Sequence, residues 1–328
     1  MAPIRIAVIG LGKIAHDQHL PAIVASDEFQ LTATVDPGAA GLLGVPHFAH
    51  LNELLKDGPK VDAVALCMPP RYRYDIAVNA MVHDLHVLLE KPPSTTYAEA
   101  ERLRVLSNTL GLTLFAAWHS RFASGVEPAR RWLAQRQIAR VTATWHEDVR
   151  VWHPGQNWIM EEGGFGVLDP GINALSILTR ILPRPMNLSY AKLFIPVNWE
   201  TPIAANLIFR DAANIEVVLD LDWRKSGPPR WDIDIETDLG PLKLENGGAI
   251  LTLPLSERPR ESKKPADLSG EYPQLYGHFA RLIESGDGDD NMQPLLHVTE
   301  VLEFGIQQTV EMFDFGVLQA GRTSTRLQ

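Results

Sequence analysis

The sequence has a single cysteine, Cys67, and it has neither a long hydrophobic run nor a cluster of basic residues. One cysteine excludes an intrachain disulfide and a cysteine-rich metal site, so Cys67 is expected to be a small buried apolar residue. A net charge of -10 without a basic cluster makes nucleic acid and anionic membranes poor partners. The apolar run at the start, in MAPIRIAVIGLG, is too short for a signal peptide or a membrane span, so a cytoplasmic location is expected.

The composition, 45% apolar over 328 residues, is typical of a globular chain with room for two domains. Up to residue 120, short runs rich in Val, Ile and Leu alternate with helical patterns, and a Thr96–Glu99 pair has the spacing of a capping box. The expected strands are residues 4–9, 31–35, 61–67, 86–89 and 113–118, and the expected helices are 15–26, 51–56, 72–81 and 97–110. This alternation predicts a doubly wound parallel sheet in a first domain, residues 1–120.

After Trp118 the pattern changes to one of longer strands joined by short polar connections. The expected helices are residues 125–137 and 170–181, and the expected strands are 138–149, 189–197, 203–209, 215–223, 230–236, 241–245 and 249–253. This pattern predicts an antiparallel meander, and so a second α/β domain, residues 121–328, with a large, mostly antiparallel open sheet. From Tyr276 onward the chain is expected to be helical apart from a polar turn at 285–291, and residues from 316 are expected to fray.

The strand expected at residues 4–9 leads directly into the glycine-rich run GLGKIA, residues 10–15. Gly10 permits a tight turn, Gly12 lets the backbone approach a pyrophosphate, and Ala15 allows close packing of a helix on the strand. The free N–H groups at the start of that helix would then face the phosphates. A glycine turn after a strand is common, but here Asp36 also ends the next strand, as a dinucleotide site requires.

Asp36 decides between the two nicotinamide dinucleotides. A carboxylate at this position accepts hydrogen bonds from the ribose hydroxyls and repels a 2′-phosphate, and Pro37-Gly38 supplies no arginine to offset the repulsion. The sequence therefore predicts NAD as the cofactor, with weaker use of NADP. The alternative is that Asp36 only forms a turn before Pro37.

Three motifs carry a resemblance to a known family: the glycine run, Glu90-Lys91-Pro92 after a strand, and GGFG at residues 163–166 leading to Asp169. With them the chain resembles the glucose–fructose oxidoreductase and inositol dehydrogenase family over nearly its whole length, up to Phe315. The resemblance implies a Rossmann domain followed by an α/β domain with a large open sheet. The predicted cofactor-binding residues are Gly10, Gly12, Lys13, Ile14, Asp36, Pro69, Glu90 and Lys91.

Within that family the chain is similar to the aldose 1-dehydrogenases that act on D-galactose or L-arabinose. The segments that suggest this are KIAHDQHLP (13–21), EKPP (90–93), WHSR (118–121), WHPGQ (152–156) and DPGIN (169–173). The implied reaction oxidises the anomeric carbon of an aldose to an aldonolactone, and D-fucose shares the relevant C2–C4 stereochemistry. The alternatives are a dehydrogenase of another sugar or polyol, such as xylose, glucose or inositol, and a non-catalytic sensor of nucleotide or sugar.

Oxidation of a hemiacetal needs a base for the O1 proton, and here the sequence departs from the wider family. Many members have histidine four residues after the helix-start aspartate, but this chain has Asn173, whose amide cannot act as a base. Asp169 is therefore the first candidate base and Lys91 the second, with Asn173 binding the same sugar hydroxyl. The alternatives are an N-cap role for Asp169, a surface position for Lys91 and a structural role for Asn173.

Four further residues are expected to contact the sugar. Glu147 lies on the apolar face of its strand, so its carboxylate needs either sugar hydroxyls or a buried partner such as an arginine. Trp152 offers a flat face to the C–H groups of a sugar, while His153 and His119 can donate to hydroxyls or can simply be packed or exposed. No ligand spacing supports a site built from His119, His146 and His153, so no metal is predicted.

The open sheet of the second domain often forms a subunit interface in this family, so a homodimer is expected, with a small-molecule aldose as the other partner. Acidic residues on one parity of the strands complicate that interface, because like charges need basic partners across it. These residues are Asp220, Asp222, Asp232, Asp234 and Glu236.

Overall fold

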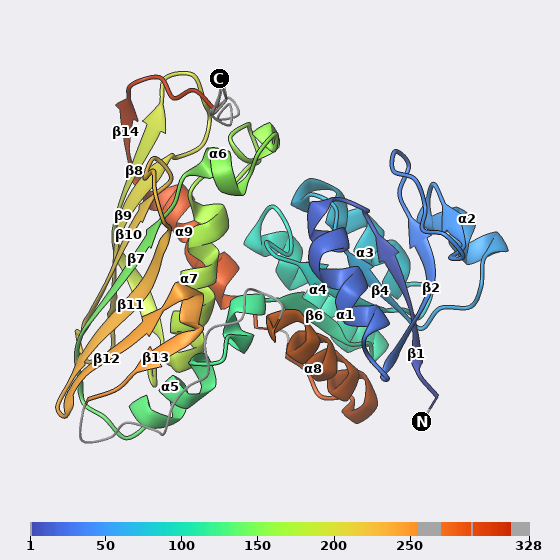
Figure 1. The fold of residues 1–328 in the computed structure, drawn as a ribbon, viewed down its shortest axis with the longest axis horizontal. Coiled ribbons are helices and arrows are strands. Elements are labelled where there is room, and N and C mark those ends of the chain that lie inside the picture. The colour runs from blue at the N-terminus through green and yellow to red at the C-terminus, as the bar shows by residue number, and fades with distance from the viewer. Residues whose placement is uncertain (1, 255–269, 290, 316–328) are drawn as a thin grey trace, which may run out of the picture.

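The computed structural model describes residues 2–254, 270–289 and 291–315, and the tail expected to fray from residue 316 lies outside them. The described chain forms two sheets, each with helices packed on it, that stand side by side (Figure 1). Within these ranges no helix combines the length and the apolar character needed to cross a membrane.

The first sheet has six strands, all parallel, in the order β3-β2-β1-β4-β5-β6. Its strands are β1 (Ile4–Ile9), β2 (Phe29–Val35), β3 (His47–Phe48), β4 (Ala63–Leu66), β5 (His86–Glu90) and β6 (Leu114–Ala117). Every residue of β4 and β6 is buried, which explains the apolar residues on both parities. The predicted doubly wound parallel sheet is confirmed, whereas β3 was missed because two residues show no periodicity.

The helices of this part follow the strands in turn. They are η1 (Ala15–His19), α1 (Leu20–Val24), α2 (Leu51–Asp57), η2 (Pro70–Tyr72), α3 (Arg73–Met81) and α4 (Tyr97–Leu110). The helix expected at residues 15–26 begins as a π-helical turn, η1, before it continues as α1. The predicted capping box of α4 is present, because Glu99 N donates to Thr96 Oγ1 at 3.2 Å and Thr96 N donates to Glu99 Oε2 at 3.3 Å.

The second sheet has eight strands in the order β13-β12-β11-β7-β10-β9-β8-β14. Its strands are β7 (Ile138–His146), β8 (Met186–Pro196), β9 (Ala204–Asp211), β10 (Glu216–Asp222), β11 (Arg230–Thr237), β12 (Gly240–Glu245), β13 (Ile250–Thr252) and β14 (Ile306–Val310). Most neighbours are antiparallel, as predicted, but β7 lies parallel to β10 and β14 lies parallel to β8. The sheet is therefore not a simple meander, since β7 is inserted between β10 and β11.

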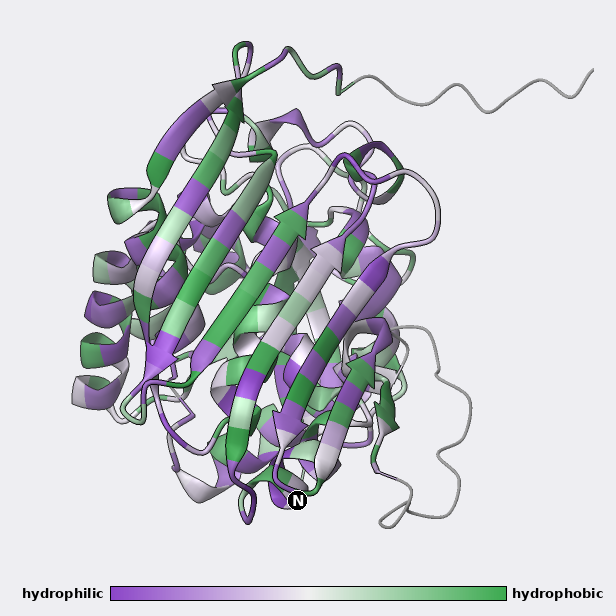
Figure 2. Ribbon diagram, turned by 90° about the vertical axis from the view of Figure 1, so that its left-hand side faces the viewer, coloured by the Kyte–Doolittle hydropathy of each residue, from purple (hydrophilic) through white to green (hydrophobic). Residues whose placement is uncertain are grey.

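Helix α7 covers the inner face of this sheet, and no helix of the described residues lies on the outer face (Figures 1 and 2). The helical segments here are η3 (His119–Phe122), α5 (Val126–Leu133), α6 (Val149–Trp152), η4 (Asn157–Ile159), α7 (Leu168–Ile181), η5 (Asn246–Gly248) and α9 (Gln293–Phe304). Packing of α7 is close, since a Cβ on Gly171 would lie 2.6 Å from Leu221 Cδ1. The open face shows alternating polar and apolar bands in Figure 2, as expected for a sheet covered on one side.

The helix α8 (Glu271–Ser285) comes late in the chain but packs on the first sheet. Its Tyr276 ring lies 5.4 Å from the ring of Phe29, and Phe279 stacks 5.9 Å from both Phe29 and Phe115. These residues share one core with Ile6 and Val8 on one face of β1. The first sheet is thus completed by a segment far from it in sequence.

Two expectations near strand ends are wrong. The strand expected at 138–149 ends at His146, because the Asp148 side chain accepts a hydrogen bond from Arg150 N at 3.0 Å and caps the short helix α6. The segment expected to stay helical after Tyr276 instead includes the strand β14, where pairing with β8 overrides local preference.

The capping box gives a test of helix stability. Thr96→Ala removes the acceptor for an N–H at the start of α4, so it is expected to lower the free energy of unfolding by about 1 kcal/mol in urea denaturation. Thr109→Ala is the matched control, because its hydroxyl donates only to Val105 O within the same helix. The control is expected to stay within about 0.5 kcal/mol of the parent, and an equal loss in both variants would contradict the capping argument.

Candidate active site

The glycine-rich run leaves β1 at the carboxyl edge of the first sheet, where the strand order reverses between β1 and β4. Gly10 has φ +91°, and a Cβ there would lie 2.6 Å from Met68 N, so the turn requires glycine. A Cβ on Gly12, in contrast, would meet nothing within 4 Å. The open side of Gly12, beside the start of η1, therefore fits the pyrophosphate of a dinucleotide.

Asp36 follows β2, and backbone N–H groups hold its carboxylate beside the glycine run. Oδ2 accepts from Leu11 N, and Oδ1 accepts from Gly38 N and Ala39 N, each at 2.8 Å. Burial opposes the charge, but the hydrogen bonds outweigh it and lower the pKa of Asp36. Asp36 therefore does form the turn that was the alternative interpretation of this residue. Its fixed negative charge is also compatible with binding the ribose hydroxyls.

The other predicted cofactor residues lie on the same loops. Lys13 is exposed and paired with Asp17, and Ile14 directly precedes η1. Pro69 precedes η2, in the loop after β4 that Gly10 touches through Met68. The structure therefore brings the β1 and β4 loops together at one edge of the sheet.

Lys91 and Asp169 meet across the two halves of the chain. Lys91 follows β5, and its Nζ donates to Oδ2 and to the backbone oxygen of Asp169, both at 3.1 Å. The Lys91 side chain is 15% exposed and that of Asp169 is 6% exposed, so Lys91 is not a surface lysine. Asp169 lies in the first turn of α7, one residue inside Leu168, so the alternative N-cap role does not hold.

Asn173 lies one turn after Asp169 on α7 and is half-buried. Residues four apart share a face of a helix, so its amide points the same way as the Asp169 carboxylate. Among the described residues nothing hydrogen-bonds that amide, although Ser176 Oγ donates to its backbone oxygen at 2.7 Å. The amide can therefore accept or donate to a ligand beside Asp169.

Glu147 is 2% exposed, so the burial inferred from strand parity is confirmed. Trp223 Nε1 donates to Oε1 at 2.8 Å, and Trp231 Nε1 donates to Oε2 at 2.7 Å. The partners are thus two indoles and not the suggested arginine. Strand order is the physical reason. Trp223 directly follows β10 and Trp231 lies on β11, and these two strands flank β7, which Glu147 follows.

Trp152 and His153 surround the same carboxylate. His153 Nε2 lies 3.6 Å from Glu147 Oε1, and its ring lies 5.3 Å from that of Trp223. The Trp152 ring packs at 4.9 Å and 63° against Trp231 and is 41% exposed. These residues form a group of aromatic rings around a buried charge, with one exposed indole face suited to a sugar.

His119 ends up buried beside α8. Its Nδ1 is hydrogen-bonded to the carboxylate of Glu271, and its ring stacks on Tyr272 at 5.5 Å and 17°. The hydrogen bond with Glu271 therefore occupies Nδ1 of His119. Binding of a sugar hydroxyl by its Nε2 remains a prediction.

Glu90, predicted to bind the cofactor, is 2% exposed and lies in a buried polar group whose other members, His19, Tyr272 and Tyr276, were not predicted as site residues from the sequence. Glu90 Oε1 accepts from the Tyr272 hydroxyl and lies 3.3 Å from His19 Nε2, while His19 Nδ1 lies 2.7 Å from the Tyr276 hydroxyl. Burial opposes both charges, but Cys67 and Glu90 raise the pKa of His19 to about 10, and His19 holds that of Glu90 at about 2. The signal available in the sequence for this buried group was His19, a histidine on an apolar helix face.

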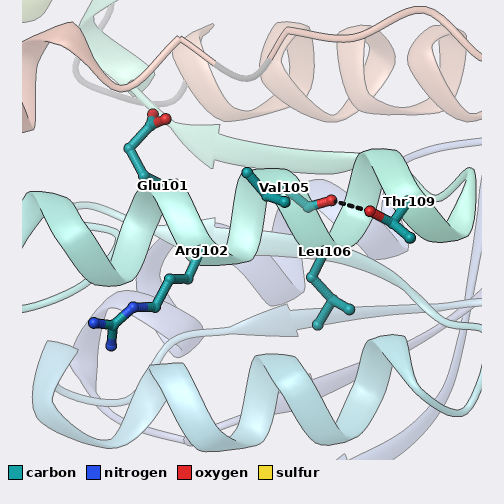
Figure 3. A pocket seen from close by; sticks show the side chains of 5 residues that line it. All are labelled: Glu101, Arg102, Val105, Leu106 and Thr109. Carbon is teal, nitrogen blue, oxygen red and sulfur yellow. Dashed lines mark hydrogen bonds between the residues drawn. The ribbon is translucent and has the colours of Figure 1, made fainter.

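Other features of the described residues offer no competing site. A hollow of about 370 Å³ lies over α4 (Figure 3), but no candidate site residue lines it. Its lining residues are Glu101, Arg102, Val105, Leu106 and Thr109. In the described ranges no group of three His, Cys, Asp or Glu side chains could hold a metal ion.

A glycine turn that fits a dinucleotide and a buried Lys–Asp pair next to it define an oxidoreductase that uses a nicotinamide cofactor. Residues 4–117 match the oxidoreductase family with an NAD-binding Rossmann fold, the glucose–fructose oxidoreductase and inositol dehydrogenase family. The chain belongs to this family, as the resemblance in the sequence predicted.

Two relatives are similar over the whole chain. The galactose 1-dehydrogenase of Pseudomonas fluorescens is 38% identical over 325 residues, which cover 95% of this chain and 99% of the relative. The crystal structure of a D-galactose-1-dehydrogenase from Rhizobium etli is 45% identical, with a TM-score of 0.89 over 96% of this chain and 99% of that one.

A more distant structure shares the fold alone. It is a 3-ketoreductase from Actinomadura kijaniata in complex with NADP, 19% identical, with a TM-score of 0.78 over 94% of this chain and 99% of that one. The two-sheet architecture is therefore shared with an enzyme whose sequence is only 19% identical.

The indole contacts of Glu147 can be tested by Glu147→Gln. A carboxamide has one acceptor oxygen, so one buried indole N–H loses its partner, and the free energy of unfolding is expected to fall by about 1–3 kcal/mol. Urea denaturation followed by tryptophan emission measures this loss. Glu245→Gln is the control, because Glu245 forms only a half-exposed pair with Lys243, and equal stability of the two variants would refute the assigned contacts.

Proposed function

We propose that this protein is an NAD-dependent galactose 1-dehydrogenase that oxidises the anomeric carbon of D-galactose to the aldonolactone. The contact of Lys91 Nζ with Asp169 at 3.1 Å, at the same carboxyl edge of the first sheet as the glycine run, carries the proposal. It gives a proton acceptor and a cation at the edge of the sheet where a nicotinamide would lie. Similarity to two galactose 1-dehydrogenases over nearly the full chain supports this choice of sugar.

Asp169 and Lys91 have different roles in the proposed reaction. When bound, NAD accepts the hydride from C1 of the sugar. Asp169 takes the O1 proton on its carboxylate, and the Lys91 ammonium stabilises negative charge on O1 as that proton leaves. Because both side chains are largely buried, water is kept from the reacting atoms.

The sugar would be oriented by groups of the second half. Asn173 binds the same O1 hydroxyl as Asp169, the partly exposed Trp152 contacts the C–H groups, and His153 binds a hydroxyl farther along the ring. Glu147, predicted from the sequence to bind sugar, instead holds the indoles of Trp223 and Trp231 behind these residues. Supporting this, the rings of Trp152 and His153 are placed by their contacts with Trp231 and Trp223. L-Arabinose and D-fucose share the C2–C4 stereochemistry of D-galactose, so we propose them as further substrates.

We also propose that the protein is a cytoplasmic homodimer. The outer face of the eight-stranded sheet carries no helix in Figure 2 and is available to a second copy. Two of the acidic residues of this sheet do not need cations from the partner, because Asp222 pairs with Arg224 and Asp232 pairs with Lys243 within the chain. The cytoplasmic location rests on the proposed use of NAD.

The reaction is tested by following absorbance of reduced nicotinamide with a panel of aldoses. D-Galactose is expected to be oxidised with the highest kcat/KM, and L-arabinose and D-fucose with values lower by roughly 10–200-fold, since a missing or altered C5 substituent costs about 1–3 kcal/mol. Asp169→Ala is expected to lower kcat by roughly 10²–10⁴-fold, the usual contribution of a general base.

Lys91→Met separates the two candidate bases. Activity that survives Asp169→Ala but disappears in Lys91→Met would transfer the role of base to Lys91. NAD binding without turnover of any sugar would reject the dehydrogenase and favour a sensor. Thr109→Ala, on α4, is a control expected to keep parental activity, because its hydroxyl donates only to Val105 O within the same helix.

The cofactor preference depends on the charge of Asp36. Asp36→Asn keeps one acceptor oxygen and removes the negative charge, so repulsion of a 2′-phosphate is expected to fall. The ratio of kcat/KM with NAD to that with NADP should decrease by roughly tenfold, equivalent to about 1.4 kcal/mol. Equal use of both cofactors by the parent enzyme would show that Asp36 does not select NAD.

A further inference from the structure

Arg73, the first residue of α3, lies behind Lys91 and is 3% exposed. Its Nη1 donates to the backbone carbonyls of Glu90 and Pro92, the two residues that flank Lys91. Its Nε donates to Met68 O at 2.7 Å, in the loop after β4. One guanidinium group therefore joins the loops that follow two neighbouring strands of the first sheet.

The position of Arg73 is unusual for the helix that carries it. The other buried residues of α3 are Ala77, Ala80 and Met81, so the guanidinium stands on an otherwise apolar face. Burial lowers the pKa of Arg73 to about 10, although the nearby charges of Glu90 and Asp169 favour its charged form. A buried charge is costly unless it is well bonded, and this one is bonded to loop carbonyls and not to its own helix.

The fork of the guanidinium suits this task. Arginine presents several N–H donors in a fixed plane, so it can hold acceptors on different segments at set positions. Glu90 is held from its other side as well, because its carboxylate accepts from Tyr272. The peptide groups on both sides of Lys91 are thus fixed, which leaves its side chain to extend toward Asp169.

We propose that Arg73 is a positioning residue for Lys91, and that it places the lysine ammonium against Asp169 by holding the carbonyls of Glu90 and Pro92. This inference rests on the proposed function, in which Lys91 contacts the reacting oxygen. Among the described residues Arg73 forms no hydrogen bond with Asp169, and its hydrogen bonds all go to backbone carbonyls, so it acts through the backbone of Lys91.

A double-mutant cycle tests the proposal. Arg73→Met is expected to lower kcat for galactose by roughly 10–100-fold with a change in KM below about threefold, because small displacements of a reacting group are costly. In a Lys91→Met background the same substitution should lower kcat by less than about twofold, since its effect passes through Lys91. Additive losses would overturn the proposal.

Two variants guard against effects on folding. Arg73→Lys keeps the charge but has one nitrogen for three carbonyls, so its kcat is expected to lie between those of the parent and Arg73→Met. If Arg73→Met does not fold, Arg73→Lys replaces it in the cycle. Arg184→Met is the control, because it removes a guanidinium that pairs with Asp211 in the second half of the chain. It is expected to keep parental kcat, and a loss equal to that of Arg73→Met would overturn the proposal.

Acetylation of Lys91 gives a readout that needs neither sugar nor cofactor. In the parent, contact with Asp169 should make Lys91 slow to react with acetic anhydride, as measured by peptide mass spectrometry. Arg73→Met is expected to speed this reaction several-fold, and an unchanged rate would overturn the positioning role. If the parent oxidises no sugar, the proposed function fails, while the acetylation rates still decide whether Arg73 positions Lys91.

Discussion

The ion pair of Lys91 and Asp169 is the contact on which the candidate site depends. It joins a loop after β5 of the first sheet to the first turn of α7, which packs on the second sheet. Because both side chains are largely removed from water, each charge is costly without the other. The relative placement of the two sheets is therefore coupled to the chemistry, since a shift of either sheet would separate the pair.

The same charge balance extends behind the pair. Glu90 lies between His19 and Tyr272, and Arg73 holds the backbone on either side of Lys91. Opposite charges thus alternate from His19 through Glu90 and Arg73 toward Asp169, so none is buried alone. This arrangement explains how a sheet edge made of apolar strands can hold so many ionised groups next to a dinucleotide site.

Sequence periodicity predicted most of the fold, because the strands of the first sheet are buried on both faces and those of the second on one. It also predicted that Glu147 is buried, since parity determines which face a side chain takes. It did not identify Trp223 and Trp231 as its partners, because they depend on strand order. The role of Arg73 was missed for the same reason: its acceptors are backbone carbonyls, which leave no trace in the identity of the residues.

Helix α8 has a consequence for how the chain acquires its structure during synthesis. The strands β1 to β6 leave the ribosome long before Glu271–Ser285, yet Tyr276 and Phe279 cover Phe29 and Phe115 in the finished molecule. Until α8 emerges, one face of the nascent sheet keeps its apolar side chains exposed, a state prone to aggregation and recognised by chaperones. Tyr272 of the same helix can donate to Glu90 only after α8 has been made, so the polar group beside Lys91 is completed later than the strands that carry it.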